Sequence, residues 1–147
     1  CNGSGQCVEC VNNNDCAVGM CQSSICVEPT LNGCTASTAQ DLTAQSAVTI
    51  TFGGALGFSY QPKCIRVKAG TQVTFSGAFG SHPLRAGQVV GTVATPDAPG
   101  TTPLPTAASG LNTGTTATFA MTPVGSYGYY CMFHASFGMD GAIFVVP

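Results

Sequence analysis

The distribution of cysteine constrains the fold of this chain more than any other feature. Seven of the nine cysteines lie within the first 34 residues, in a stretch rich in Gly, Asn and Ser. Such a stretch has too few apolar residues for a core, so its cysteines predict disulfide bonds made in an oxidising compartment. The chain of 147 residues therefore divides into a disulfide-rich module with its linker at 1–33 and a larger domain at 34–147.

Whether the number of cysteines is even or odd indicates how they pair. Residues 1–26 hold six cysteines in the spacing C-x5-C-x2-C-x5-C-x4-C-x4-C, and six cysteines allow 15 pairings. If Cys131 is set aside, eight remain, and a bond between Cys34 and Cys64 would fasten the larger domain while the first six pair among themselves. A lipid anchor on Cys1 would leave an odd number, so we favour a bridge there.

Charge and hydropathy exclude several classes of partner. Charged residues make up 7% of the chain and the net charge is −2, whereas about a quarter of an ordinary soluble domain is charged. The chain has no basic surface for nucleic acid, and no apolar run approaches the roughly 18 residues of a membrane-spanning helix. A surface kept soluble by Ser, Thr, Asn and Gln suits an extracytoplasmic protein, either periplasmic or secreted, with attachment to a surface left open.

The larger domain shows the alternation of β-strands. Apolar and polar residues alternate in 47–52, 64–68 and 71–75, so one face of each strand is expected to be buried. In the second of these segments Ile65 and Val67 are expected to point inward, with their charged neighbours in solvent.

Turn signals and the remaining segments complete an all-β pattern. The dipeptide Ala69–Gly70 predicts a hairpin between the strands on either side of it. No segment has sustained helical periodicity, and 95–116, rich in Pro, Thr and Gly, is expected to be a long surface connection. Roughly seven or eight short strands separated by Gly and Pro turns predict a sandwich or barrel. Further strands are expected at 89–93, 117–121, 127–131 and 142–146.

A metal-ligand pattern lies near the C-terminus. Cys131, His134 and Met139 form the pattern C-x2-H-x4-M. Thiolate, imidazole and thioether favour copper over magnesium, calcium or manganese. Because the chain has only two histidines, a second imidazole must come from His82. Two His and one Cys in a plane with a weak axial Met is the blue-copper arrangement.

Each of these residues also has an ordinary structural explanation. Cys131 could be a buried free thiol or half of a disulfide, and Met139 could simply fill the core. A lone histidine is usually structural as well. The copper hypothesis depends on the four occurring together.

The sequence around these residues resembles the cupredoxin family. The similarity lies in Phe75-x6-His82, in Tyr-x-Tyr-Tyr-Cys-x2-His-x4-Met-x-Gly-x-Ile and in 58–75, and it covers about 47–147. The ligand loop is similar in length to those of plastocyanin and pseudoazurin. The resemblance implies a Greek-key β-sandwich that holds one type 1 copper. It assigns His82 and His134 as nitrogen ligands, Cys131 as thiolate and Met139 as axial ligand.

One position departs from the family pattern. Family members often have Asn after the first histidine ligand, whereas this chain has Pro83. Proline has no backbone N–H, so an amide that would bond the Cys131 sulfur is absent. We expect the thiolate to be more electron-rich and to favour Cu(II).

The function implied by the resemblance is one-electron transfer, with the copper alternating between Cu(I) and Cu(II). The expected partners are extracytoplasmic redox proteins that dock near His134, and the protein is expected to be a monomer. An enzyme is not expected, because no imidazole remains for a second copper centre or a hydrolytic triad. Two other functions remain open: copper storage or delivery, and a secreted adhesion or partner-binding module on a copper-stabilised scaffold. The docking patch is expected to include Pro83, Leu84, Phe133, Ala135, Phe137 and Gly138.

Overall fold

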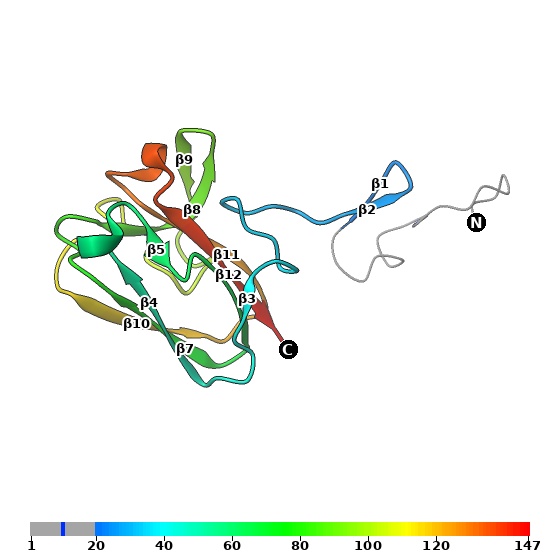
Figure 1. Ribbon diagram of the computed structural model, residues 1–147, viewed down its shortest axis with the longest axis horizontal. Coiled ribbons are helices and arrows are strands. Elements are labelled where there is room, and N and C mark those ends of the chain that lie inside the picture. The colour runs from blue at the N-terminus through cyan, green and yellow to red at the C-terminus, as the bar shows by residue number, and fades with distance from the viewer. Residues whose placement is uncertain (1–9, 11–19) are drawn as a thin grey trace, which may run out of the picture.

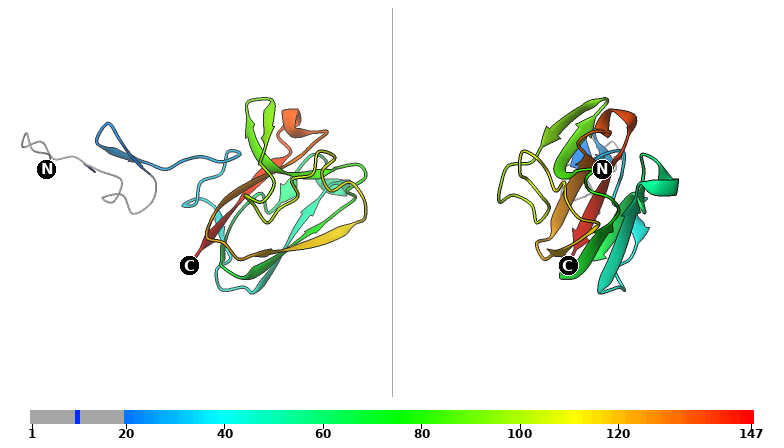
Figure 2. Two further views of the ribbon diagram at one scale, coloured as in Figure 1. Left: turned by 180° about the vertical axis from the view of Figure 1, so that it is seen from behind. Right: turned by 90° about the vertical axis from the view of Figure 1, so that its left-hand side faces the viewer.

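Two sheets packed face to face form the body of the protein, and the end-on view in Figure 2 shows them as two layers. The computed structural model describes Cys10 and residues 20–147. The larger sheet has the order β3-β6-β12-β11-β8-β9 and the smaller one β10-β7-β4-β5. The predicted all-β sandwich is confirmed (Figure 1). Its strands are β3 (Gln40–Asp41), β4 (Ala47–Phe52), β5 (Tyr60–Gln61), β6 (Cys64–Lys68), β7 (Thr71–Ser76), β8 (Leu84–Val90), β9 (Val93–Pro96), β10 (Thr116–Met121), β11 (Gly125–Cys131) and β12 (Asp140–Val146).

The alternating pattern places the core between the sheets. Ile65 and Val67 are fully buried, as predicted, while Lys68 is exposed and Arg66 pairs with Asp41 at 2.7 Å. Phe75 lies at the centre, with its ring 5.0 Å from that of Tyr129 and 6.1 Å from that of Tyr60. Edge-to-face packing of this kind stabilises aromatic cores beyond the area that they bury.

The predicted hairpin at Ala69–Gly70 is wrong. β6 pairs with β12 and β3, whereas β7 pairs with β4 and β10, so the turn carries the chain from one sheet to the other. The turn contacts both sheets, because Ala69 N–H bonds to Val146 O at 2.8 Å and Gly70 N–H to Met121 O at 2.9 Å. The two strands bury their apolar faces against each other across the core instead of sharing a ladder.

The strand predicted at 89–93 is a turn flanked by two strands. β8 runs to Val90 and pairs with β9, with Val90 opposite Val93. Gly91 has φ +62°, which a two-residue hairpin loop requires and glycine adopts readily. The connection expected at 95–116 follows, although β9 occupies its start and Leu104 within it is buried.

The N-terminal part of the described chain contains a second, smaller pair of strands. β1 (Met20–Gln22) and β2 (Ile25–Val27) form a hairpin that Figure 1 shows apart from the two sheets. Cys10 is disulfide-bonded to Cys21, and Cys26 is disulfide-bonded too. The bond from Cys10 to Cys21 agrees with pairing among the first six cysteines, while Cys1, Cys7 and Cys16 lie outside the described residues.

The chain between this hairpin and β3 covers the outer face of β12. The predicted bond between Cys34 and Cys64 is present, and Cys34 packs with Ala142 and Phe144 in a small apolar cluster. β12 is therefore buried on both faces, as its near-continuous apolar sequence requires. No helix in 20–147 is both long and apolar enough to cross a membrane.

Candidate metal centre

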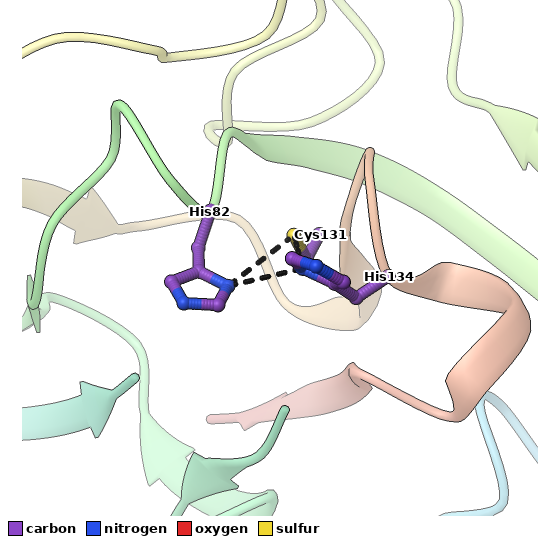
Figure 3. Close-up of side chains that lie close together, drawn as sticks. All are labelled: His82, Cys131 and His134. Carbon is purple, nitrogen blue, oxygen red and sulfur yellow. Dashed lines mark hydrogen bonds between the residues drawn. The ribbon is translucent and has the colours of Figure 1, made fainter. Parts of the chain in front are cut away.

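Three of the four predicted ligands meet at one end of the sandwich, and Figure 3 shows their side chains turned toward one another. His82 lies in the loop before β8, Cys131 ends β11, and His134 follows three residues later. Cys131 is completely buried, His82 is 9% exposed and His134 is half-buried. Within the described residues this is the one group of His, Cys, Asp or Glu side chains close enough to share an ion.

The donor atoms of these residues form a compact triangle. The two Nδ1 atoms lie 3.1 Å apart, and the Cys131 sulfur lies 3.4 Å from Nδ1 of His134 and 3.9 Å from Nδ1 of His82. A circle through three points with these separations has a radius of about 2 Å, close to the metal–nitrogen bond length of about 2.0–2.1 Å known for zinc. One ion therefore fits between the three atoms, and a thiolate with two imidazoles is a donor set suited to copper.

A glycine on the neighbouring loop lets the His82 ring take this position. Gly53 has φ +71°, and a β-carbon on it would lie 3.0 Å from Cδ2 and 3.2 Å from Nε2 of His82. The Phe52 ring meets His82 edge-on, with centroids 6.1 Å apart. Glycine at position 53 therefore leaves room for the far edge of the imidazole, while Nδ1 faces the other two donors.

The segment from Cys131 to Met139 is closed by its own hydrogen bonds. Cys131 N–H bonds to Met139 O at 2.9 Å, and Met139 N–H bonds to His134 O at 3.2 Å. A single turn of 3-10 helix, Ala135–Phe137, ends at Gly138 with φ +80°. This left-handed position favours glycine, and it returns the chain toward Cys131.

Met139 lies beside the cluster, although its role as a ligand stays a prediction. Its side chain is fully buried in the same apolar core as Cys131. Its main chain bonds to both Cys131 and His134. Pro83 is also fully buried, and its carbonyl accepts a bond from Met132 N–H at 2.9 Å.

Burial sets the protonation of the metal-free cluster. Burial lowers the pKa of His82, and the neighbouring His134 ring lowers this pKa further. Burial also raises the pKa of the Cys131 thiol, against the opposing effect of the Phe133 and His134 backbone N–H groups. The imidazole is therefore ready to bind a metal, whereas the thiol must lose its proton when it does so, and metal affinity should increase with pH.

An aromatic residue that the sequence analysis did not assign to the site covers His134. The Phe58 ring stacks on this imidazole with centroids 4.0 Å apart and planes at 14°. Phe58 also lies 5.6 Å from the Phe137 ring. Phe58 precedes β5 in the chain and is about 75 residues from His134, so only the packing of the sheets brings the two rings together. No local pattern in the sequence indicates this contact.

The structure corrects the predicted apolar patch around His134. Phe133 and Phe137 are 61% and 70% exposed, as expected for a docking surface, and Gly138 is exposed too. Pro83, Leu84 and Ala135 are buried and cannot belong to it. Phe58, 48% exposed, takes their place. We call Phe58, Phe133 and Phe137 the phenylalanine patch.

Two mixed sheets with a His–Cys–His cluster at one end define a copper-binding β-sandwich of the cupredoxin class. The family model described as "Copper binding proteins, plastocyanin/azurin family" matches residues 46–146. The chain belongs to this family.

Comparisons with solved structures found similar folds. Plastocyanin from Dryopteris crassirhizoma is 25% identical over 67% of this chain and 100% of its own, with a TM-score of 0.45. A purple cupredoxin from Nitrosopumilus maritimus is 24% identical over 67% and 99%, with a TM-score of 0.41. The copper-containing nitrite reductase NirK from Thermus scotoductus SA-01 is 23% identical over 69% of this chain, with a TM-score of 0.44, and the match spans 22% of the reductase. No curated protein sequence matches significantly.

Proposed function

We propose that this protein is a one-electron carrier with one type 1 copper bound by His82, Cys131, His134 and Met139. The observation that carries the proposal is the triangle of two imidazole nitrogens and one buried thiol sulfur, with a radius that suits a metal bond of about 2 Å. Copper in such a set supplies a couple that exchanges a single electron with little change of geometry.

The protein's own residues keep that geometry fixed. Cys131 stands at the end of a strand that is paired on both sides. The His82 ring lies edge-on to Phe52 and close to the backbone at Gly53, where a β-carbon would crowd it, and Phe58 stacks on the His134 ring. Because these contacts restrict each ligand, the site should need little rearrangement when an electron is gained or lost.

Electron transfer without catalysis is the function that the residue inventory supports. Both histidines of the chain belong to the proposed copper site, so neither remains for a second copper or as a general base. The disulfides from Cys10 to Cys21 and from Cys34 to Cys64 support an extracytoplasmic location, because cytosolic thiols are normally kept reduced.

We also propose that the chain has two units, a small cysteine-rich module and the copper-binding sandwich. The sequence alone predicts the boundary between residues 33 and 34. The bonds of Ser37 to Glu28, with its N–H 2.8 Å from Oε1, and the packing of Leu31 beside Cys34 favour a boundary just before Glu28. A fragment that begins at residue 28 should therefore keep the complete sandwich.

Electron paramagnetic resonance of the copper-loaded protein tests the proposed site. We expect a narrow copper hyperfine splitting, because a thiolate in the copper plane draws spin density onto sulfur, together with a reversible one-electron wave in voltammetry. A wide splitting typical of copper without a thiolate ligand would contradict the type 1 assignment. A colourless protein that holds only Cu(I) and passes it to an acceptor would instead indicate copper delivery.

We propose that redox partners dock on the phenylalanine patch. Its three uncharged rings lie against His134, which is the proposed ligand nearest to solvent. A small apolar contact suits brief encounters, in which an electron passes before the partners separate.

Replacing Phe137 by lysine tests this docking surface without a known partner. Electron self-exchange between copper-loaded copies requires two patches to meet, and like charges there should lower the rate about tenfold at low salt. The rate is measured from the broadening of proton NMR lines in mixtures of the oxidised and reduced protein. The matched control is Val124→Lys, because Val124 is 57% exposed and lies at the opposite end of β11 from Cys131. Equal rates in both variants would rule out the patch.

A further inference from the structure

Asn32 lies in a tight turn outside residues 46–146, the part of the chain that the family match covers. The turn is closed by two bonds of 2.9 Å between the backbones of Leu31 and Cys34. Asn32 has φ +53° and Gly33 φ +70°, which an Asn-Gly pair adopts readily in a type I′ turn. The disulfide from Cys34 to Cys64 fastens this turn to β6.

The side chain of Asn32 bonds to three strands at once. It is 4% exposed, and its Nδ2 lies 3.2 Å from Gly87 O, 3.0 Å from Tyr129 O and 2.9 Å from Gly141 O. Its Oδ1 accepts a bond from Val89 N–H at 2.7 Å. One buried amide therefore joins β8, β11 and β12.

These bonds lie where β8 leaves its neighbour in the larger sheet. The ladder between β8 and β11 extends as far as Ala86, and from Gly87 onward β8 pairs with β9. Where β8 separates from β11, the side chain of Asn32 supplies hydrogen bonds in place of those between the two strands. A β-carbon on Gly128 would collide with Gly87 O and lie 3.1 Å from Asn32 Nδ2, so glycine at 128 leaves the room that the amide occupies.

The three strands joined by Asn32 are also those beside the proposed ligands. His82 lies two residues before β8, Cys131 ends β11, and Met139 immediately precedes β12. We propose that Asn32 is a positioning residue that fixes these three strands relative to one another, and with them the donor atoms of the metal centre. The segment that leads from the cysteine-rich module would then take part directly in the geometry of the copper site.

The energetics of buried polar groups support this role. Without the amide, Val89 N–H would lose its partner inside the protein, which a folded structure avoids by shifting its backbone. A shift of β8 against β11 would change the separation of His82 from Cys131. Loss of a group that hydrogen-bonds a metal ligand directly commonly weakens metal binding about 10- to 100-fold. Asn32 acts through the strands that carry the ligands, so we expect an effect near the lower end of this range.

The test compares the variant Asn32→Gly with the unaltered full-length protein. Glycine keeps the positive φ of the turn and removes only the amide. We expect Cu(I) affinity, measured by competition with a chromophoric chelator, to decrease about tenfold or more, and the hyperfine splitting of the Cu(II) form to change. In the metal-free protein, hydrogen exchange of the Val89 amide should become faster.

Two control variants separate positioning from general loss of stability. Ser37→Ala removes the hydrogen bond that the Ser37 hydroxyl donates to Glu28 in the same segment, without touching the ligand strands, and Val48→Ala weakens the core in the smaller sheet. Both should keep the affinity and spectrum of the unaltered protein. If Val48→Ala reproduced the loss seen with Asn32→Gly, the effect would be one of stability and the proposal would be overturned.

This inference rests on the proposed ligand set, and the two can fail separately. If the unaltered protein bound no copper through Cys131, the proposed function itself would fail. If the unaltered protein bound copper as proposed while Asn32→Gly kept its spectrum and its affinity within about twofold, Asn32 would have no positioning role even if Val89 exchanged faster.

Discussion

Replacing Cys131 by serine should abolish the intense visible absorption of the copper-loaded protein and leave at most a weak, wide-splitting Cu(II) signal. The intense absorption and the narrow hyperfine splitting both arise from a copper–thiolate bond. A serine hydroxyl cannot replace it, because the hydroxyl keeps its proton near neutral pH and is a poor ligand for a soft metal. The described chain contains one free cysteine, Cys131, so no other thiolate in it can take over. Absorption and paramagnetic resonance spectra, recorded after copper loading, measure the effect.

A neighbouring sulfur provides the control for this substitution. Met132 adjoins Cys131 in the chain, is half-buried and lies outside the proposed ligand set. The variant Met132→Leu should keep the full absorption, because a volume-conserving exchange costs little in packing and leaves the thiolate in place. A Cys131→Ser protein with undiminished colour and an intact redox wave would refute the proposed centre.

Removing the disulfide between Cys34 and Cys64 should cause the largest loss of stability of any change considered. The bond closes a loop with a sequence separation of 30, and the loop entropy that it removes from the unfolded chain corresponds to about 3–4 kcal/mol. Cys34 also packs against Ala142 and Phe144, so the outer cover of β12 loosens as well. The double variant Cys34→Ala with Cys64→Ala should unfold at a clearly lower denaturant concentration.

The experiment needs a control on the same surface. Thr35 adjoins Cys34, and its hydroxyl bonds to groups of the same segment between β2 and β3, namely Ser37, Thr38 and Glu28, so Thr35→Ala should change stability by less than about 1 kcal/mol. Urea unfolding followed by tyrosine fluorescence, with equal slopes for all proteins, compares the free energies. A double variant no less stable than Thr35→Ala would show that the covalent link adds nothing to the fold.

Local pattern predicted much of the secondary structure. The segments 47–52 and 64–68 coincide with β4 and β6, and Ile65 and Val67 point into the core. Alternation of apolar and polar residues predicts these strands well, because it arises directly when one face of a strand is buried and the other is exposed to solvent. Parity of the cysteines likewise predicted the bond between Cys34 and Cys64.

The local sequence pattern did not predict which strands pair with one another. The turn at Ala69–Gly70 looks like a hairpin in sequence, yet its two strands belong to different sheets. Periodicity shows that both strands bury one face, but it does not reveal whether those faces are neighbours in one layer or opposed across two. The patch prediction failed at Leu84 and Ala135 for a similar reason, because burial depends on what covers a residue.

The chemical nature of the site was present in the sequence from the start, because a chain with two histidines and a C-x2-H-x4-M loop offers few ways to assemble a soft metal site. The residues that support the site could not be identified from the sequence. Gly53 beside His82, Phe58 against His134 and the amide of Asn32 between β8, β11 and β12 come from loops distant in the chain. Each reaches its place only after the sheets have packed. Residue types fix which atoms can bind a metal, whereas long-range packing decides which other groups hold those atoms in place.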